Sequence, residues 1–246
     1  MSLGHGASIV RDGLVLHLDA ANVKSYPGTG TTWTDLSGNG NDGTLTNGPT
    51  FDSANKGSIV FDGVNDTCNI NTSVGNFGTS DFTIGFWYNK SVVDSNKCFM
   101  AKSNGGNPIT DYGWLFNNPS GTTEFGFACA SVTGSWGIDG SYTIKTTGAD
   151  LVGTGWGYIV VVADRSSTDV SFYKNAEELS TTSYVGGNGK FNLVGTLSNN
   201  LTTKIGAESD NLYINTKMSM VQFYNRALTA DEIKQNFEAF RGRYGI

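Results

Sequence analysis

The residues of this chain best placed to do chemistry lie in one glycine-rich loop, TDLSGNGNDGT. Five oxygen-bearing side chains fall within eight residues there: Asp35, Ser37, Asn39, Asn41 and Asp42. Calcium takes six to eight oxygen ligands from carboxylates, side-chain amides and backbone carbonyls, and the intervening glycines allow carbonyls to turn toward one ion. The loop therefore predicts a calcium site. The alternative is a tight hairpin whose Asp and Asn side chains bond their own backbone.

A second acidic turn, FDGVND, could complete that site. Asp62 follows an expected strand there, and the turn closes with an Asn-Asp pair. Asp-Gly turns are common, so this turn alone indicates little. Together, the two turns predict one structural calcium site formed by Asp35, Asn39 and Asn41 with Asp62. Zinc is disfavoured because neither turn contains Cys or His, and magnesium because it demands tight octahedral geometry.

Aromatic residues in or beside the glycine-rich loops are the candidate ligand-binding residues. Sugars present C–H faces that stack on exposed rings, while nearby Asn and Asp side chains bond the hydroxyls. The residues in such positions are Tyr26, Trp33, Trp114, Trp136 and Tyr142. A role as core residue or loop anchor is the alternative for each of them. Trp87 and Trp156 are expected to be structural.

No catalytic arrangement stands out in the sequence. A glucanase on a β-sandwich needs paired carboxylates that alternate on one strand, and no run has that spacing. The closest run, Asp231, Glu232 and Glu238, lies on an expected helix, where the first two residues suit the cap and the helix dipole. The motifs G-x-S-x-G and H-E-x-x-H are absent. We therefore expect the chain not to be an enzyme.

Composition indicates a folded, acidic protein. Its 246 residues suit one large all-β domain, and a hydrophobic share of 38% suffices for a core. A net charge of −6 argues against a nucleic-acid binder. No apolar run approaches a membrane span, and the first ten residues lack the features of a signal peptide. We expect residues 1–8 to be a flexible tail or a cloning remnant, and residues 9–246 to form one domain.

The three cysteines, Cys68, Cys98 and Cys129, have no metal-type spacing. An odd number without a signal peptide argues against a disulfide framework. Because each lies in a strand-like run, we expect three buried free thiols.

Alternating apolar residues predict strands along most of the chain. In FTIGFWYNK, Phe82, Ile84, Phe86 and Tyr88 should share the inward face. Similar strand-like runs are LVLHLD, GSIVFDG, CFMAK, GWLF, TEFGFACA, SYTIKT, GYIVVVAD, DVSFYKN, NLVGTL, TKIGA and MSMVQFYN. Gly- and Asn-rich turns separate these runs at spacings of about 8–15 residues, which is typical of an antiparallel sandwich or barrel.

One segment near the end predicts a short helix. Thr229 followed by Glu232 forms a capping box, and Leu228 with Ile233 would form the hydrophobic staple around it. Ile233, Phe237 and Phe240 fall on one face. Gly242 is placed to end the helix.

The order of these motifs resembles a known family. The succession GLVLHLDA, WTDLSGNGNDGTL, GSIVFDG, FTIGFWY, GWGYIVVVAD, VSFYKN, KIGA and VQFYNRALTADEI is similar to the concanavalin A-like lectin/glucanase superfamily, in its LamG-like branch. The resemblance runs from about residue 13 to 240. It implies an all-β fold of two antiparallel sheets in a jelly roll, a frequent structural calcium ion at the sheet rim, and a carbohydrate-binding or adhesive role.

The first and last segments resemble LamG-like proteins encoded by tailed phages. Two positions depart from the family pattern: Thr67 stands where relatives often have Tyr, and Ala176 stands where they often have the Gly of an Asn-Gly turn. The catalytic carboxylates of the glucanase branch are absent.

The resemblance and the motifs together lead to a functional expectation. We expect a non-enzymatic glycan-binding or adhesive domain of a phage virion, made in the host cytoplasm without a signal peptide. Its partners would be a host-surface glycan or other virion proteins, without nucleic acid or membrane insertion, and with multivalent display. The alternatives are a purely structural decoration protein and a glycoside hydrolase with unrecognised carboxylates.

Overall fold

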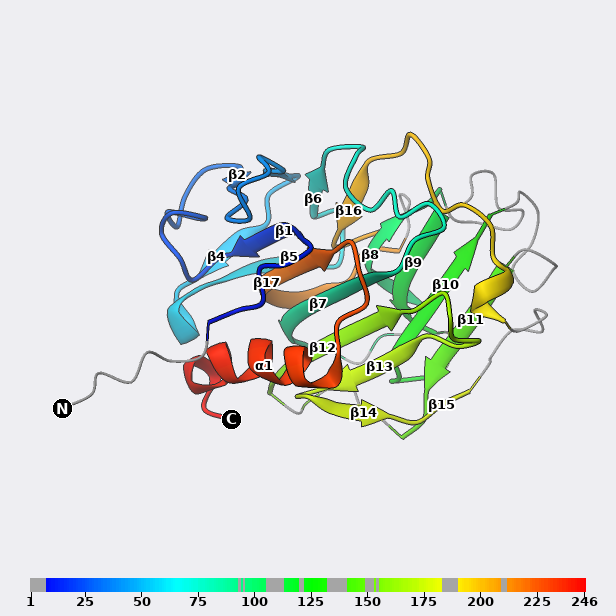
Figure 1. Ribbon diagram of the computed structural model, residues 1–246. Helices are drawn as coiled ribbons and strands as arrows, with labels where there is room; N and C mark the ends of the chain where they lie inside the picture. Colours follow the sequence, from blue (N-terminus) through cyan, green and yellow to red (C-terminus); the bar gives the residue numbers. More distant parts are fainter. Residues whose placement is uncertain are drawn as a thin grey trace.

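Two antiparallel β-sheets pack face to face in the computed structural model of the chain (Figure 1). The structure describes residues 8–246 except 93, 95, 105–112, 120–121, 132–140, 149–152, 154, 183–189 and 209–211. The predicted tail therefore lies almost wholly outside the described residues. The prediction of an all-β, two-sheet jelly-roll sandwich with one C-terminal helix is confirmed.

Within the described residues, the first sheet has eight strands. In spatial order they are β14 (Glu177–Leu179), β13 (Ser171–Lys174), β12 (Trp156–Ala163), β7 (Phe82–Asn89), β17 (Asn215–Tyr224), β5 (Ser58–Asp62) and β4 (Thr50–Asp52), and β1 (Leu14–Asp19) also pairs with β17. In the part of the chain that the structure describes, the second sheet has nine strands: β15 (Thr181–Thr182), β11 (Ser141–Thr146), β10 (Gly126–Ala130), β9 (Gly113–Asn118), β8 (Lys97–Lys102), β16 (Thr203–Ile205), β6 (Thr67–Ile70), β3 (Gly43–Thr46) and β2 (Thr32–Trp33).

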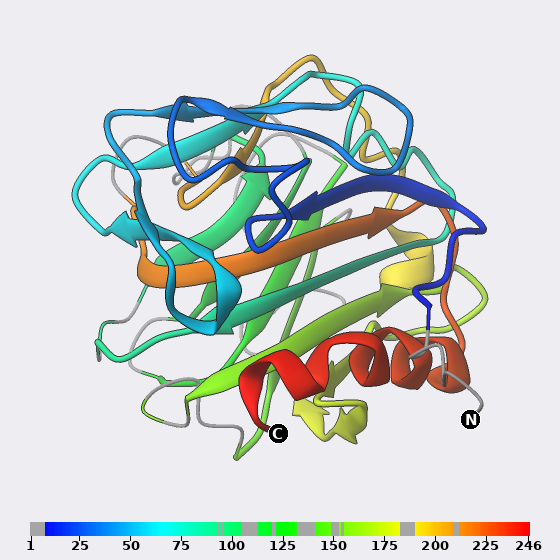
Figure 2. The ribbon, with the colours of Figure 1, turned by 90° about the vertical axis from the view of Figure 1, so that its left-hand side faces the viewer.

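Strand β17 is the centre of the first sheet, as Figure 2 shows. One of its edges pairs with β7 along its length, and the other is shared between β5 and β1. The register shifts between Met218 and Met220. At this bulge the Ser219 hydroxyl donates to the Gly57 carbonyl at 2.6 Å, and the Ser219 carbonyl accepts from the Ala20 amide at 2.8 Å. The bulge thus marks the change from one partner strand to the next.

The main core fills the space between the sheets. The four residues predicted to point inward from β7 all lie in it, in agreement with the alternation in FTIGFWYNK. The three cysteines are buried free thiols, as predicted. Burial raises the pKa of the Cys129 thiol to about 12, so this group stays protonated near neutral pH.

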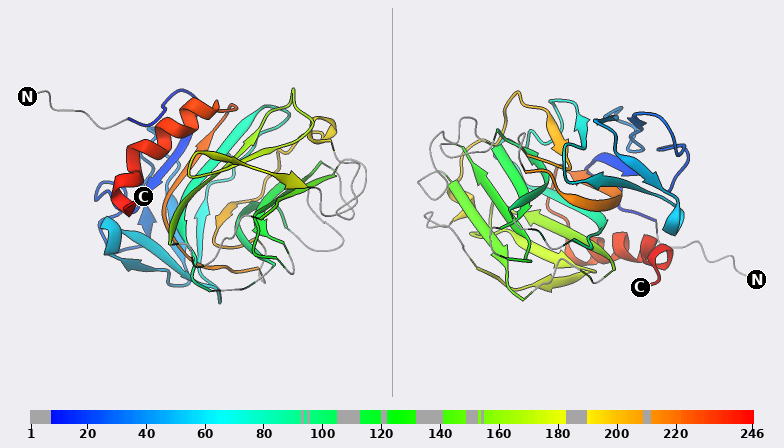
Figure 3. Two further views of the ribbon diagram at one scale, coloured as in Figure 1. Left: turned by 90° about the horizontal axis from the view of Figure 1, so that it is seen from below. Right: turned by 180° about the vertical axis from the view of Figure 1, so that it is seen from behind.

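A second apolar cluster covers the outer face of the first sheet. Helix α1 (Ala230–Tyr244) lies across that face, as the edge-on view in Figure 3 shows. Ile233, Phe237 and Tyr244 from the helix pack with sheet residues that include Trp87. The Tyr244 and Trp87 rings are stacked with centroids 4.1 Å apart. The outward Trp87 is therefore structural, because the helix covers it.

The predicted helix start is confirmed, but the predicted end is wrong. Thr229 is the N-cap, and the capping box with Glu232 is complete. The helix passes through Gly242 and ends at Tyr244, with Gly245 in the left-handed conformation at φ 76°. The extra turn forms because the side chains of Arg243 and Tyr244 have partners on the sheet.

One expected strand is also wrong. The run NLVGTL begins in a short 3₁₀ helix, η2 (Phe191–Leu193), and Phe191 is buried in the main core. A second 3₁₀ segment, η1 (Ala54–Lys56), connects β4 and β5. Among the described residues, no helix combines the length and the apolar composition needed to cross a bilayer.

Candidate functional site

The glycine-rich loop that predicted calcium is held by hydrogen bonds to Asp35. The Asp35 Oδ1 atom accepts from the backbone amides of His17 and Ser37, both at 2.9 Å. Its Oδ2 atom accepts from the Ser37 hydroxyl at 2.7 Å and from the Asn41 amide at 3.0 Å. Asp35 as a whole is 8% exposed. Four donors thus satisfy a buried carboxylate that fixes the loop on β1.

The two predicted amide ligands also have partners. The Asn39 Nδ2 atom donates to the carbonyls of Leu14 and Val15, both at 3.1 Å. The Asn41 side chain donates to the Val15 carbonyl at 2.9 Å, and its Oδ1 accepts from Asn71 Nδ2 at 2.7 Å. These contacts tie the loop to β1, which is the role of a hydrogen-bonded turn.

Asp62 belongs to a separate turn. Its Oδ1 accepts from the Val64 amide at 2.8 Å, and its own amide donates to Asp66 Oδ2 at 3.0 Å. Its carbonyl accepts from Asn215 Nδ2 at 2.8 Å on the adjacent β17. Among the described residues, no hydrogen bond joins Asp62 to the loop of Asp35.

The residues present do not fit the calcium site that the sequence predicted. N–H and O–H groups point at both Asp35 carboxylate oxygens, whereas a cation needs these lone pairs. Within the part of the chain that the structure describes, no three His, Cys, Asp or Glu side chains are grouped to hold a metal. The geometry favours the alternative interpretation, a turn whose polar side chains bond backbone.

The predicted sugar-stacking residues lie in the interior. Trp33, Trp114 and Tyr142 are fully buried and Tyr26 is 4% exposed, all four within the main core. Trp136 lies outside the described residues. The prediction that these rings form a binding surface is wrong for the four described residues, because a ring without exposed surface cannot stack on a ligand from solvent.

Three of these buried aromatics anchor loops through their polar atoms, and one of them is Tyr26, whose hydroxyl donates to the Gly30 carbonyl at 2.9 Å. The Trp114 indole donates to the Gly75 carbonyl at 2.9 Å. The Tyr142 hydroxyl donates to Asp169 Oδ1 at 3.1 Å and accepts from the Val170 amide at 3.0 Å. A buried ring with a satisfied polar tip is the usual arrangement in a core.

A pocket of about 310 Å³ lies instead on the outer side of the first sheet, where α1 begins. Its size is at the lower end of the range for small-molecule sites. The wall consists of residues from the end of β12, the following loop, β13 and the chain entering α1: Val162, Asp164, Ser167, Asp169, Ser171, Tyr173, Ala227, Leu228, Thr229 and Ala230. We call this feature the α1 pocket.

The loop from Asp164 to Asp169 supplies the carboxylates of the α1 pocket. The Asp164 Oδ1 atom accepts from the amide and the hydroxyl of Ser166, at 2.8 and 2.7 Å. Asp169 is held through Oδ1 by the buried Tyr142 hydroxyl. Asp164 therefore fixes the loop through one oxygen, whereas Asp169 uses both, since its Oδ2 accepts from the Thr168 hydroxyl at 3.3 Å. Asp164 Oδ2 makes no hydrogen bond within the described part of the chain.

Tyr173 provides the aromatic surface of the α1 pocket. It lies in β13 between Val160 of β12 and Glu178 of β14, is partly buried, and packs at the edge of the second apolar cluster. Partial burial raises the pKa of its hydroxyl, and the Glu178 carboxylate raises it further. The hydroxyl is therefore a neutral donor and acceptor near neutral pH.

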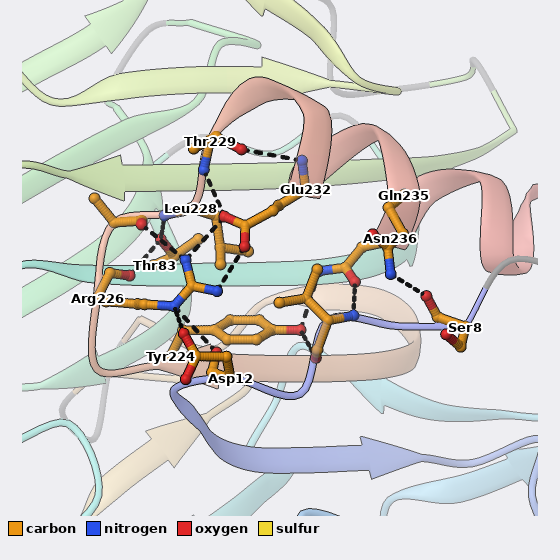
Figure 4. A network of polar contacts seen from close by, with 12 residues as sticks. Ser8, Asp12, Thr83, Tyr224, Arg226, Leu228, Thr229, Glu232, Gln235 and Asn236 are labelled. Carbon is orange, nitrogen blue, oxygen red and sulfur yellow. Dashed lines mark hydrogen bonds and ion pairs between the residues drawn. The ribbon is translucent and has the colours of Figure 1, made fainter.

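A polar network holds the other wall of the α1 pocket in place, as Figure 4 shows. The Thr83 hydroxyl donates to the Arg226 carbonyl and accepts from the Leu228 amide, both at 2.9 Å. The Arg226 guanidinium meets both oxygens of Glu232 at 2.6 and 2.8 Å, and its Nε lies 2.8 Å from Asp12 Oδ2. The chain between β17 and α1 is thus fixed before the helix begins.

The α1 pocket was not predicted from the sequence. The run from Asp164 to Asp169 is as rich in oxygen as the loop of Asp35 and was the one available signal. Nothing local indicates that this run lies beside Thr229, since about sixty residues separate the two segments.

The sequence of the chain matches a model of a known protein family. A family model described as the concanavalin A-like lectin/glucanases superfamily matches residues 61–234. No curated protein matches the chain by sequence.

Several solved structures are similar in three dimensions. The binding domain of Paraclostridial Mosquitocidal Protein 1 is 19% identical with a TM-score of 0.67, over 92% of this chain and 52% of that one. The botulinum neurotoxin serotype D ligand-binding domain, solved with N-acetylneuraminic acid, is 11% identical with a TM-score of 0.66, over 93% and 51%. Trypanosoma rangeli sialidase, solved with 2,3-difluorosialic acid, is 16% identical with a TM-score of 0.61, over 95% and 34%.

The chain is similar to these structures in its fold. The chain spans about half the length of the two toxin domains and about a third of the sialidase. At such identities, the fold is shared while the sites are free to differ.

Proposed function

The chain belongs to the concanavalin A-like lectin/glucanase superfamily, and from this premise we propose that it is a non-enzymatic carbohydrate-binding or adhesive domain. The observation that carries the proposal is the α1 pocket. It combines the Tyr173 ring with carboxylate and hydroxyl oxygens in a hollow of about 310 Å³. An aromatic face beside several hydrogen-bonding oxygens suits a sugar, which has apolar C–H faces and hydroxyls on its rim.

The similar structures add support at the level of the fold. Two of them were solved with sialic-acid compounds, so sandwiches of this shape occur in proteins that contact sugars. The proposal for this chain rests on its own pocket, because low identity carries no site residues across.

Binding at such a pocket should be weak for each copy. A dissociation constant near 1 mM corresponds to only about −4 kcal/mol. Adhesion would then need several copies on one particle, since linked sites raise the effective concentration. We further propose that the domain belongs to a phage virion, at a tail fibre, baseplate or capsid surface, where many copies would be displayed together. The support for that setting is the resemblance of both ends of the sequence to phage-encoded proteins.

The absence of catalysis is also part of the proposal. Glycoside hydrolysis needs two carboxylates placed on either side of the scissile bond. In the α1 pocket, Asp164 and Asp169 each use an oxygen to hold their own loop. We therefore assign them to binding.

The test is binding to a glycan array by protein displayed in many copies on beads. We expect wild type to bind a subset of glycans and Tyr173→Ala to lose that binding while keeping its melting temperature within a few degrees. Tyr213→Ala serves as a control, because Tyr213 does not line the α1 pocket. Absence of binding by wild type would favour a purely structural decoration protein, and release of reducing sugar would favour a glycosidase.

A further inference from the structure

The charged side chains that line the α1 pocket are all acidic. Its wall contains the carboxylates of Asp164 and Asp169, and no Lys, Arg or His belongs to the described wall. The whole chain carries a net charge of −6. An anionic ligand entering the pocket would meet two negative groups without a cation to pair with.

The two arginines next to the wall in sequence are committed elsewhere. Arg165 follows Asp164, but its guanidinium donates to backbone carbonyls, including those of Val194 at 2.7 Å and Gly78 at 3.1 Å. It also lies 4.3 Å above the centre of the Phe191 ring, within the loop it fastens. Arg226 precedes Ala227, but Glu232 and Asp12 hold its guanidinium. Neither arginine can pair with an acidic ligand without abandoning these contacts.

The start of α1 does not supply the missing positive charge. A helix N-terminus carries partial positive charge and favours anions. Here, however, the first turn contains two acidic residues, Asp231 and Glu232. The Glu232 amide is bonded to the Thr229 hydroxyl at 3.3 Å, and the Glu232 side chain returns to the Thr229 amide at 3.0 Å. The helix start thus already has two acidic side chains of its own beside its partial positive charge.

Uncharged sugars suit the same groups. A carboxylate accepts hydrogen bonds from hydroxyl donors, and such charge-assisted bonds are about twice as strong as neutral ones. Asp164 Oδ2 and the Ser171 hydroxyl make no hydrogen bond within the described part of the chain. They lie in one wall with the partly buried Tyr173. A neutral sugar ring offers the hydroxyl donors that these acceptors lack.

We infer that the α1 pocket selects uncharged sugars and discriminates against sialylated or otherwise acidic glycans. This inference rests on the proposed glycan-binding function and adds the chemical class of the ligand. It also separates this chain from the serotype D toxin domain and the sialidase, which were solved with sialic-acid compounds.

The experiment titrates wild type with matched pairs of oligosaccharides, each neutral glycan and its sialylated form, at low ionic strength. We expect the neutral member to bind at least about threefold more tightly than the sialylated member. Repulsion between the added negative charge and one nearby carboxylate in water would produce a ratio of this size. Asp164→Asn should narrow that ratio by improving binding of the sialylated member. Glu238→Gln on the exposed side of α1 makes the same change in net charge and should leave the ratio unchanged. Raising the salt concentration should narrow the ratio in wild type, because it screens the carboxylates.

The outcomes separate the two proposals. Equal or tighter binding of the sialylated member would overturn the inference and leave glycan binding standing. The inference would also be overturned if Glu238→Gln changed the ratio of the two affinities as much as Asp164→Asn does. The effect would then come from the net charge of the protein. Absence of binding by every pair would overturn the proposed function, and the inference with it.

Discussion

Arg243 in the last turn of α1 forms a two-pronged ion pair with Asp19 at the end of β1, although 224 residues separate them. Its Nη1 and Nη2 atoms lie 2.7 and 3.1 Å from the two carboxylate oxygens. The side chains are 15% and 4% exposed. This pair joins the end of the chain to its first strand and keeps the helix in register over the sheet.

Removing one partner of that pair should be costly. We expect Arg243→Met to lower the free energy of unfolding by about 3–5 kcal/mol, because it leaves the Asp19 carboxylate buried and unpaired. Arg241→Met is the control, since Arg241 pairs with Glu238 at the surface, where the two side chains are 47% and 40% exposed. That change should cost less than about 1 kcal/mol. Similar losses in the two variants, measured by urea unfolding, would contradict the account of the Asp19 pair.

The salt bridge at the other end of α1 should make stability depend on pH. The Arg226 guanidinium holds the pKa of Glu232 down to about 2, from an ordinary value of 4.5. A lowered folded-state pKa stabilises the protein above pH 4.5, and the stabilisation is lost as pH falls toward 2. The free energy of unfolding of wild type should therefore exceed that of Glu232→Gln by about 1 kcal/mol at neutral pH, a value that allows for the partial exposure of Glu232. The difference should shrink between pH 4.5 and 2, and a constant difference across this range would contradict the assignment.

The turn between β13 and β14 contains avoidable strain. Asn175 and Ala176 both have positive φ, at 54° and 69°. An L-residue in this conformation costs about 1–2 kcal/mol, and glycine avoids that cost. Ala176→Gly should therefore stabilise the protein by about 1 kcal/mol. The same change at Ala239 within α1 should destabilise it by a similar amount. Both variants are measured by thermal unfolding. If Ala176→Gly destabilises the protein as Ala239→Gly does, the backbone of the turn differs from the one described.

The loop of Asp35 should stabilise the fold without calcium. Asp35→Ala removes an acceptor of four hydrogen bonds and should cost on the order of 3 kcal/mol in the presence of chelator. Asp62→Ala, in an exposed turn with one such bond, should cost less than about 1 kcal/mol. Millimolar calcium should leave the melting temperature of wild type unchanged. A calcium-induced rise that both variants abolish would instead support the metal site that the sequence predicts.

The strands and the helix start were predictable because their signals are local. Alternation of apolar residues in FTIGFWYNK follows directly from the two-residue repeat of a strand. The capping box depends on two residues three positions apart, and it formed as predicted at Thr229 and Glu232. The helix end was less predictable, because contacts of Tyr244 and Arg243 with distant strands extended the helix past Gly242.

The site was not predictable for the converse reason. Trp33 and Trp114 lie beside glycine-rich segments, which suggested exposure, but both side chains are buried between the sheets. Asp35 has the residue type of a metal ligand, yet its oxygens are taken by amides that only the fold brings near, such as that of His17. The α1 pocket forms only when β13 and the start of α1 meet, so no sequence window contains it.

The central claim is that the α1 pocket binds a sugar, and the most direct test locates the ligand on the protein. Isotope-labelled protein is titrated with the neutral oligosaccharide that binds best on the array, and amide chemical shifts are followed by NMR. We predict saturable shifts centred on Ser167, Ser171, Tyr173 and Ala230, and their loss in Tyr173→Ala. Shifts centred on the second sheet or on the loop of Asp35, with the α1 pocket unaffected, would contradict the claim.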